Sequence, residues 1–238
     1  MLTMRVTFHS SHIYGDFSSR ELTVDILRED DARGTTTADQ ISFEVPADFH
    51  THNDSVAAAL MTLVGRSCSQ VSFSFPISQH CADLLRLHYG LVDVGPVDPS
   101  LEPRRPGRFL GLMLSGGFDS MALWLVLRRV LGDAFKVVTT EFGRGFSFEA
   151  RGYTQFRRDV SCRTNFRSKG FADQGRFTAA VPLLFADYAD LAAVTTGHHF
   201  VHTPLSIDSM REGGRFLFLD EDRPLQAGGL TKSISCAG

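Results

Sequence analysis

A chain of 238 residues is long enough to bury a sizeable hydrophobic core, either as one large domain or as two small ones. Its composition is ordinary for a globular protein, and the formal net charge of −3 at pH 7 gives no general argument for nucleic acid or an anionic membrane as a partner. The most apolar stretch, 109–127, is interrupted by Ser, Gly and Asp, and the N-terminus lacks the apolar core of a signal peptide. These features predict a cytoplasmic protein with no membrane partner.

The four cysteines are widely spaced and include no Cys-x-x-Cys pair: Cys68, Cys81, Cys162 and Cys236. Such spacing predicts reduced thiols rather than a disulfide framework or a zinc site.

Residues 1–104 have the pattern of a small α+β region whose role the sequence leaves open. Alternating apolar and polar residues predict four strands, at 4–9, 21–26, 41–45 and 71–75. Apolar residues at helical spacing predict helices at 55–64 and 79–89, the first with an apolar face of Ala57, Leu60, Met61 and Val64.

The proline-rich segment 97–107 is the best candidate for a linker. The basic group Arg104, Arg105 and Arg108 lies at the end of this segment and closely precedes the strand expected at 109–114. These arginines are expected to be solvated, with a contribution to a phosphate site as the alternative.

Residues 105–238 alternate strand and helix, which predicts an α/β domain: a parallel sheet with helices on both faces. The expected strands cover 109–114, 135–140, 159–164 and 191–196, and the expected helices cover 117–131 and 175–188. Each expected strand is followed by small or polar residues. Because ligands bind at the carboxyl ends of strands in such sheets, this edge is the expected site.

The first of these strands leads into the segment 115–120, Ser-Gly-Gly-Phe-Asp-Ser, and then into the first helix. Two glycines allow a close backbone approach to a ligand, and a helix N-terminus favours negative charge. The carboxylate of Asp119 fits there if a divalent cation bridges it to phosphate oxygens. The alternative is that Asp119 and Ser120 only cap the helix.

The segment resembles the pyrophosphate-binding loop, Ser-Gly-Gly-x-Asp-Ser, of the PP-loop ATP pyrophosphatases, a superfamily that includes 7-cyano-7-deazaguanine synthase and asparagine synthetase. The resemblance covers roughly 108–238 and implies a Rossmann-like, PP-loop type domain that binds ATP and Mg²⁺. It implies that the loop contacts the nucleotide through Ser115, Gly116, Gly117, Phe118, Asp119 and Ser120, with Asp119 as the metal ligand and a catalytic residue.

Three further strand ends supply candidate residues. Thr140, Glu141 and Phe142 follow the second strand, where the superfamily approaches the nucleoside, although the same residues make an ordinary exit into a loop. Thr164 and Asn165 follow the third strand, and basic side chains flank them. After the fourth strand, Gly197 and His198 resemble the superfamily's Thr-Gly-His stretch, so His198 is a candidate catalytic residue that hydrogen-bonds phosphate, with loop packing as the alternative.

Lys232 lies in a Leu-Thr-Lys stretch that resembles one found late in several members, where the lysine faces phosphate. A flexible ammonium group suits a pyrophosphate leaving group, although a lysine near a C-terminus is usually solvated. Two features of the named enzymes are missing: the zinc-binding cysteine cluster of the deazaguanine synthase, and the leading cysteine of a glutamine amidotransferase, since Leu2 follows Met1.

The resemblance implies an ATP-dependent ligase or amide-forming enzyme that adenylates a small carboxylic acid, releasing pyrophosphate and then AMP. One alternative is a PP-loop sulfurtransferase acting on RNA; no basic face or cysteine pair indicates it, and nucleic acid is not an expected partner. Another is a non-catalytic ATP-binding assembly subunit. The acceptor, the nucleophile, a homo-oligomeric state and any chain beyond Gly238 are left open.

Overall fold

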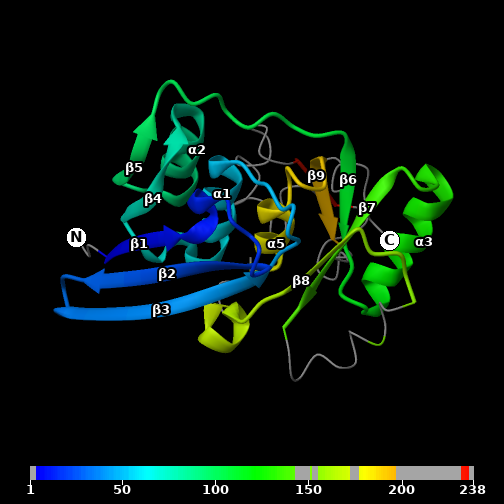
Figure 1. The fold of residues 1–238 in the computed structure, drawn as a ribbon, viewed down its shortest axis with the longest axis horizontal. Coiled ribbons are helices and arrows are strands. Elements are labelled where there is room, and N and C mark those ends of the chain that lie inside the picture. The colour runs from blue at the N-terminus through cyan, green and yellow to red at the C-terminus, as the bar shows by residue number, and fades with distance from the viewer. Residues whose placement is uncertain (1–3, 143–150, 152–154, 172–176, 197–231, 236–238) are drawn as a thin grey trace, which may run out of the picture.

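The computed structural model describes residues 4–142, 151, 155–171, 177–196 and 232–235. These residues form an α/β protein with two sheets that lie on either side of a layer of helices (Figure 1). The α/β class expected from the sequence is therefore confirmed.

The first sheet is mixed, with strand order β3-β2-β1-β4-β5. Strand β2 is antiparallel to both β1 and β3, whereas β4 is parallel to β1 and β5 is parallel to β4. The strands are β1 (Met4–Ser10), β2 (Glu21–Asp30), β3 (Thr35–Glu44), β4 (Gln70–Ser78) and β5 (Asp93–Asp98).

The alternating sequence of β1 explains how this sheet is oriented. Val6 and Phe8 are fully buried, whereas Arg5 and His9 on the other face are exposed. Helices α1 (Asn53–Val64) and α2 (Gln79–Tyr89) pack against the strands, α1 on β4 and α2 on β4 and β5. A half-buried strand needs this period of two, which is why these strands were predictable.

Helix α1 differs from the amphipathic helix that its sequence predicted. Every residue from Asp54 to Val64 is buried, because the helix lies between the first sheet and α5 (Ala180–Leu184) of the second half (Figure 1). A helix that is apolar on all sides belongs in such a layer. Its backbone amide at Asp54 donates to Nδ1 of His52, the N-cap residue.

Strand β5 was not predicted, because Pro96 and the neighbouring prolines suggested a linker. Val97 and Asp98 instead pair with the end of β4. A proline is tolerated there because β5 is an edge strand, where a backbone amide need not donate to the ladder.

The second sheet is parallel throughout: four strands in the order β9-β6-β7-β8, with β10 added beside β9. Helix α3 (Phe118–Leu131) covers one face and α5 the other, as expected for this class (Figure 1). The strands are β6 (Phe109–Met113), β7 (Phe135–Glu141), β8 (Val160–Arg163), β9 (Leu191–Thr196) and β10 (Lys232–Ser235).

The helix expected at 175–188 is shorter in the structure. A 3-10 turn (Phe177–Ala179) precedes α5, and residues 172–176 lie outside the described residues. Beyond Leu184 the chain tightens into turns, in which the amide of Ala186 donates to the carbonyl of Leu183 and the amide of Asp190 to that of Asp187. Bonds to the third preceding residue close a helix end in this way.

The two halves share one core. Buried residues from α1 and β3 form a single hydrophobic cluster with Val181, Phe185 and Leu191 of the second half. Beside this cluster, β3 and β8 approach each other through a bridge between Phe43 and Thr164. The two sheets therefore meet within one packed interior.

Arg104 connects the two halves by hydrogen bonds at the junction between the sheets. Its guanidinium Nε donates to Oδ1 of Asp187 at 2.9 Å, and its Nη2 donates to the carbonyls of Ala186 and Leu191 at 3.0 and 2.8 Å. Its backbone amide donates to Oδ2 of the fully buried Asp54 at 3.2 Å. The side chain is 2% exposed, so the expectation of a solvated arginine was wrong at this position.

Candidate functional site

The strand order of the second sheet has one switch point. The chain runs from β6 through β7 to β8 and then returns to the other side of β6 as β9, so the order reverses between β6 and β9. Open α/β sheets bind ligands at such a switch point, outside the carboxyl ends of the strands. The loop 115–120 follows β6 directly and thus begins at this point.

The loop has the backbone that its glycines predict. Gly116 is left-handed, with φ of 81°, and Gly117 is extended as the N-cap of α3, with φ of −78° and ψ of 162°. Oγ of Ser120 donates to the carbonyl of Gly117 at 2.9 Å and lies 3.2 Å from Oγ of Ser115. The two hydroxyls that flank the loop in sequence are therefore neighbours in space.

Among the described residues, no side chain caps the start of α3. The alternative prediction, that Asp119 and Ser120 serve as caps, is thus wrong, because Gly117 occupies the N-cap position. Asp119 instead lies exposed in the first turn. A helix start without a side-chain cap leaves backbone amides to be satisfied by water or by a ligand, and an anion is favoured there.

This loop fits a phosphate group and offers one carboxylate, that of Asp119, to a metal. The described residues contain no group of three or more His, Cys, Asp or Glu that would hold a metal ion by themselves. A magnesium ion held by one carboxylate needs oxygen ligands from a nucleotide and from water, which is the usual arrangement for this ion. The residues present therefore fit magnesium that arrives with a nucleotide.

The end of β7 lies beside the loop, since the amide of Leu114 donates to the carbonyl of Val138. Thr140 is half-buried there, and Glu141 is held by basic side chains. Nη1 of Arg158 lies 3.3 Å from Oε1 of Glu141, and Nη2 of Arg163 lies 3.5 Å from Oε2. Glu141 thus stabilises this edge of the sheet through ion pairs. That it also binds a nucleotide stays a prediction.

Phe142 packs edge-on against the buried Phe166, with ring centroids 5.3 Å apart. The guanidinium of Arg167 lies 5.6 Å from the centre of the Phe142 ring. An aromatic ring with a cation over it forms a partly buried wall at the end of β7.

Thr164 and Asn165 face the junction with the first sheet. Thr164 is buried and bridges to Phe43, and Oδ1 of Asn165 accepts a 2.9 Å hydrogen bond from the amide of Ser42 in β3. These contacts give both residues a structural role at the junction. Their predicted contact with a nucleotide is untested, and the structure does not bring them to the loop at 115–120.

Two of the remaining candidates, Gly197 and His198, lie outside the described residues. Lys232 begins β10, where its backbone is opposite Ala193 of β9, while Ser235 is opposite Thr196 at the carboxyl end. Three strand residues span about 10 Å. The backbone of Lys232 therefore starts about that far from the edge that carries the loop, and its phosphate contact stays a prediction.

The described cysteines are buried thiols. Burial raises the pKa of Cys68 to about 11 and also raises the pKa of Cys81 and Cys162. A thiol with a raised pKa holds little thiolate at neutral pH and is a poor nucleophile. Cys236 lies outside the described residues.

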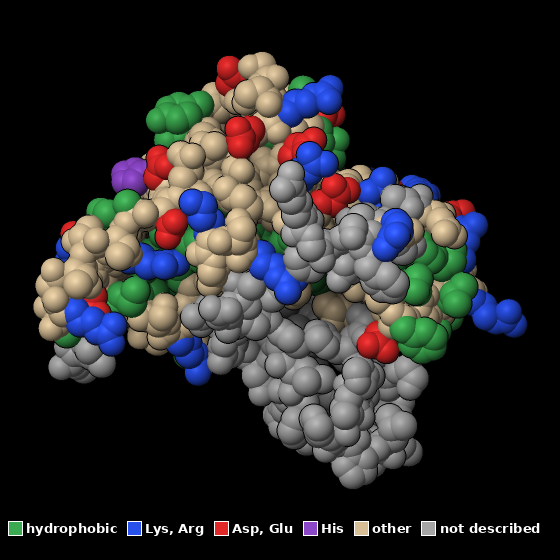
Figure 2. All heavy atoms as spheres, turned by 90° about the horizontal axis from the view of Figure 1, so that it is seen from below, with side chains coloured by type: hydrophobic (Ala, Val, Ile, Leu, Met, Phe, Trp, Pro, Cys, Tyr) green, Lys and Arg blue, Asp and Glu red, His purple; other side chains and the backbone are tan. Residues whose placement is uncertain are grey.

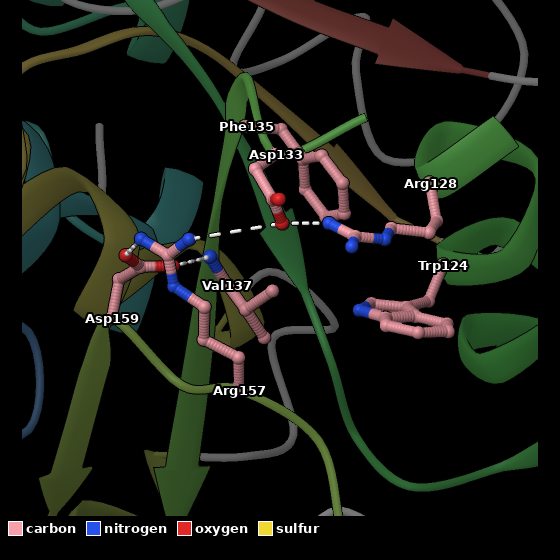
Figure 3. Close-up of a pocket in the computed structure, with 7 residues that line it drawn as sticks. All are labelled: Trp124, Arg128, Asp133, Phe135, Val137, Arg157 and Asp159. Carbon is pink, nitrogen blue, oxygen red and sulfur yellow. Dashed lines mark hydrogen bonds and ion pairs between the residues drawn. The ribbon is translucent and has the colours of Figure 1, made fainter. Parts of the chain in front are cut away.

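A hollow of about 300 Å³ opens at the opposite end of the sheet, near the starts of β7 and β8 (Figure 3). Asp133 lies between Arg128 and Arg157, and Nη2 of Arg157 donates to Oδ1 of Asp159 at 2.7 Å. Trp124 forms the other wall. These charges largely neutralise one another, and the amino ends of parallel strands are not where such sheets bind ligands, so we place the site at the loop.

Sequence reasoning missed Arg158 as a partner of Glu141 and Arg104 as the junction residue. Neither had a local signal, because each partner lies 17 or more positions away along the chain.

No protein-family model, no curated protein and no solved structure matches this chain. Within the described part of the chain, none of the helices is long and apolar enough to cross a membrane.

Proposed function

We propose that this protein is an ATP-dependent ligase that adenylates a small carboxylic acid, releasing pyrophosphate, before a nucleophile displaces AMP. One observation carries the proposal: a Ser-Gly-Gly-Phe-Asp-Ser loop joins a strand to a helix without a side-chain cap, at the switch point of a parallel sheet. The resemblance of that loop to the pyrophosphate-binding loop of the PP-loop ATP pyrophosphatases supplies the reaction type.

In this proposal the loop binds the β- and γ-phosphates. The left-handed backbone at Gly116 turns the chain, and the amides at the start of α3 donate to phosphate oxygens. The adjacent hydroxyls of Ser115 and Ser120 add donors on the same side. The carboxylate of Asp119 would hold a magnesium ion, which when bound would neutralise part of the phosphate charge.

The chain's contribution to the rate is then orientation and charge stabilisation. Thr140 and Phe142 at the end of β7 are proposed to border the nucleoside, and the position of β7 next to β6 supports this. His198 and Lys232 are proposed as the catalytic residues that bind the departing pyrophosphate.

The sulfurtransferase alternative receives no support from the described thiols, since Cys68, Cys81 and Cys162 are buried and have raised pKa values. A non-catalytic ATP-binding subunit would use the same loop. The two hypotheses differ only in whether the protein turns over ATP.

The test is to incubate the full chain with ATP, magnesium and a panel of carboxylic acids, and to identify the products by mass spectrometry. The ligase predicts AMP and pyrophosphate that depend on one class of acid. Release of ADP and orthophosphate would contradict the loop assignment. ATP binding without turnover across the panel would favour the assembly subunit.

The loop itself is tested by calorimetry on Asp119→Asn, with Asp31→Asn as the matched control in an exposed turn. Magnesium-dependent ATP affinity should fall by about tenfold or more in the first variant, because the metal loses its protein ligand, and should not change in the second. Equal affinities for ATP in the two variants would remove the metal assignment.

A further inference from the structure

The hollow at the amino ends of β7 and β8 combines apolar walls with charged side chains. Its volume of about 300 Å³ is at the lower end of the range for small-molecule sites, so it suits a ligand built on one ring. In Figure 2 basic and hydrophobic side chains gather on the right-hand side, where Figure 1 places α3. We call this space the α3–β7 hollow, and it is lined by Trp124, Arg128, Asp133, Phe135, Val137, Arg157 and Asp159.

Three residues supply the apolar part of the α3–β7 hollow. Phe135 and Val137 are buried and belong to β7. Trp124 forms a wall from α3, and its ring packs edge-on against Phe156 with ring centroids 4.8 Å apart. In Figure 3 the nitrogen-bearing side of this indole is directed toward the middle of the hollow. The indole therefore offers a ligand a flat apolar surface together with one N–H donor.

The charged groups of the α3–β7 hollow carry an excess of one positive charge. Two arginines and two aspartates line it, and Lys136 adds a further cation because its Nζ lies 3.4 Å from Oδ1 of Asp159. The Asp159 side chain is only 10% exposed, and its Oδ2 accepts a 2.9 Å hydrogen bond from the amide of Val137. With Asp159 held by Lys136 and by that amide, the guanidiniums of Arg128 and Arg157 share the remaining carboxylate, that of Asp133.

Asp133 occupies the position that an anionic ligand would take between the two guanidiniums (Figure 3). It pairs with Arg128, and its Oδ1 lies 3.9 Å from Nη1 of Arg157. Its side chain is 66% exposed, in the turn between α3 and β7. Exposed ion pairs are weak, and a guanidinium binds a carboxylate through two parallel hydrogen bonds. The carboxylate of a ligand can therefore compete with Asp133 for both arginines.

We propose that the α3–β7 hollow binds a small aromatic carboxylate. The carboxylate of the ligand lies between the guanidiniums of Arg128 and Arg157 and displaces Asp133, while its ring packs on Trp124 and Phe135. A single negative charge matches the excess of the site, which favours a carboxylate over a phosphate monoester, whose charge is about −2 at neutral pH. The apolar lining favours an anion that carries a ring over a bare inorganic ion.

This site is distinct from the one at the loop 115–120. The loop follows the carboxyl end of β6, whereas the hollow lies at the amino end of the neighbouring β7. Six residue steps along β7, from Phe135 to Glu141, span about 20 Å. A small molecule in the hollow therefore does not reach phosphates bound at the loop, and the inference does not depend on the proposed ligase activity.

Fluorescence titration of the full chain tests the site directly, because Trp124 is the sole tryptophan of the sequence. The probe is benzoate, with benzamide as the analogue without the charge and acetate as the analogue without the ring. We expect a saturable change in fluorescence with benzoate, and an affinity at least about tenfold lower for each analogue. The absence of a saturable change with benzoate, or an equal affinity for either analogue, would overturn the proposal.

Substitutions with opposite expected effects locate the bound probe. Arg157→Gln should weaken benzoate binding by at least about tenfold, because the carboxylate loses a charged partner. Asp133→Asn should strengthen it by about threefold, because the competing carboxylate is removed. Arg33→Gln is the matched control and should change nothing, since Arg33 is 80% exposed and pairs with Asp30 in the turn after β2. Unchanged or weaker binding in Asp133→Asn, or equal effects of the two arginine substitutions, would contradict the proposed position of the ligand.

Discussion

The two faces of the parallel sheet are packed very differently. One face lies against α5 and, through it, against α1 and the first sheet, in the main hydrophobic cluster of the protein. Among the described residues, the other face is covered by α3, with Phe156 packed beside it. A separate buried cluster lies between this helix and the sheet: Leu112, Leu114, Leu123, Leu127, Phe135 and Val137. The loop 115–120 belongs to the second face. The comparison teaches that the larger hydrophobic core lies on one face of this sheet, whereas the candidate site lies with α3 on the other face.

The largest effect is expected at the junction. Arg104→Leu should lower the free energy of unfolding by about 3–5 kcal/mol, because it leaves the carboxylate of Asp187 partly buried without its cation. The matched control is Arg105→Leu, since Arg105 is 83% exposed and its ion pair is with the exposed Glu102. Urea denaturation should show little change in the control. Equal losses of unfolding free energy in the two variants would show that Arg104 does not stabilise the junction.

A pair of leucine truncations measures the difference between the clusters. Leu60→Ala in α1 should cost about 4 kcal/mol and Leu123→Ala in α3 about 2 kcal/mol, within the usual range for buried leucines. The reason is that a helix held on one side shifts to fill a cavity, whereas α1 is packed on all sides. Urea denaturation of both variants compares them, and the reverse order would contradict the proposed division of stability.

The loop should be sensitive to its backbone. Gly116→Ala should cost about 1–2 kcal/mol, because φ at this position is 81° and an alanine resists left-handed geometry. Gly116→Asn should cost less, since asparagine tolerates that conformation best among the larger residues. Thermal unfolding of the two variants distinguishes them, and the same loss in both would point to a cause other than φ.

The smallest effect concerns pH. His12 is buried between Ser10 and Asn53, and burial lowers its pKa below the ordinary value of 6.5. Below pH 6.5 the imidazole of His12 therefore binds a proton more readily in the unfolded chain than in the folded one. The free energy of unfolding should be highest above pH 6.5 and should decrease as the pH falls below that value. Urea midpoints of the parent and of His12→Gln, compared above and below that pH, should converge at low pH. A constant difference between them would exclude this residue as the cause.

Much of the fold could be predicted because it depends on local patterns. The alternation in β1 and the apolar run of β6 are signals within a few residues. Helix α1 was expected to have one apolar face, because sequence periodicity shows which side chains are apolar but not how many neighbours surround them. Strand β5 was missed because proline predicts breaks, and only the position at the sheet edge permits Pro96 there.

The candidate site was predictable at the loop and less so around it. Adjacent glycines followed by a helical pattern are a local signal, and the structure places them between a strand and a helix as expected. The contact between Asn165 and Ser42 joins residues 123 positions apart. No pattern near Asn165 indicates whether its amide is used by the fold or by a ligand, so its position had to come from the structure.

The reversal of strand order also determines when the surroundings of the loop 115–120 are complete during folding. Until β9 arrives, β6 is an edge strand with β7 on one side only, although β6 leads directly into the loop 115–120. An open edge of this kind is a template for pairing with other chains. A nascent chain that has emerged only as far as β8 therefore has the loop without β9 on the other side of β6, and it exposes a strand edge that is prone to aggregation. In this protein the last strand to reach the centre of the sheet both completes the surroundings of the candidate site and covers the open edge of the middle strand.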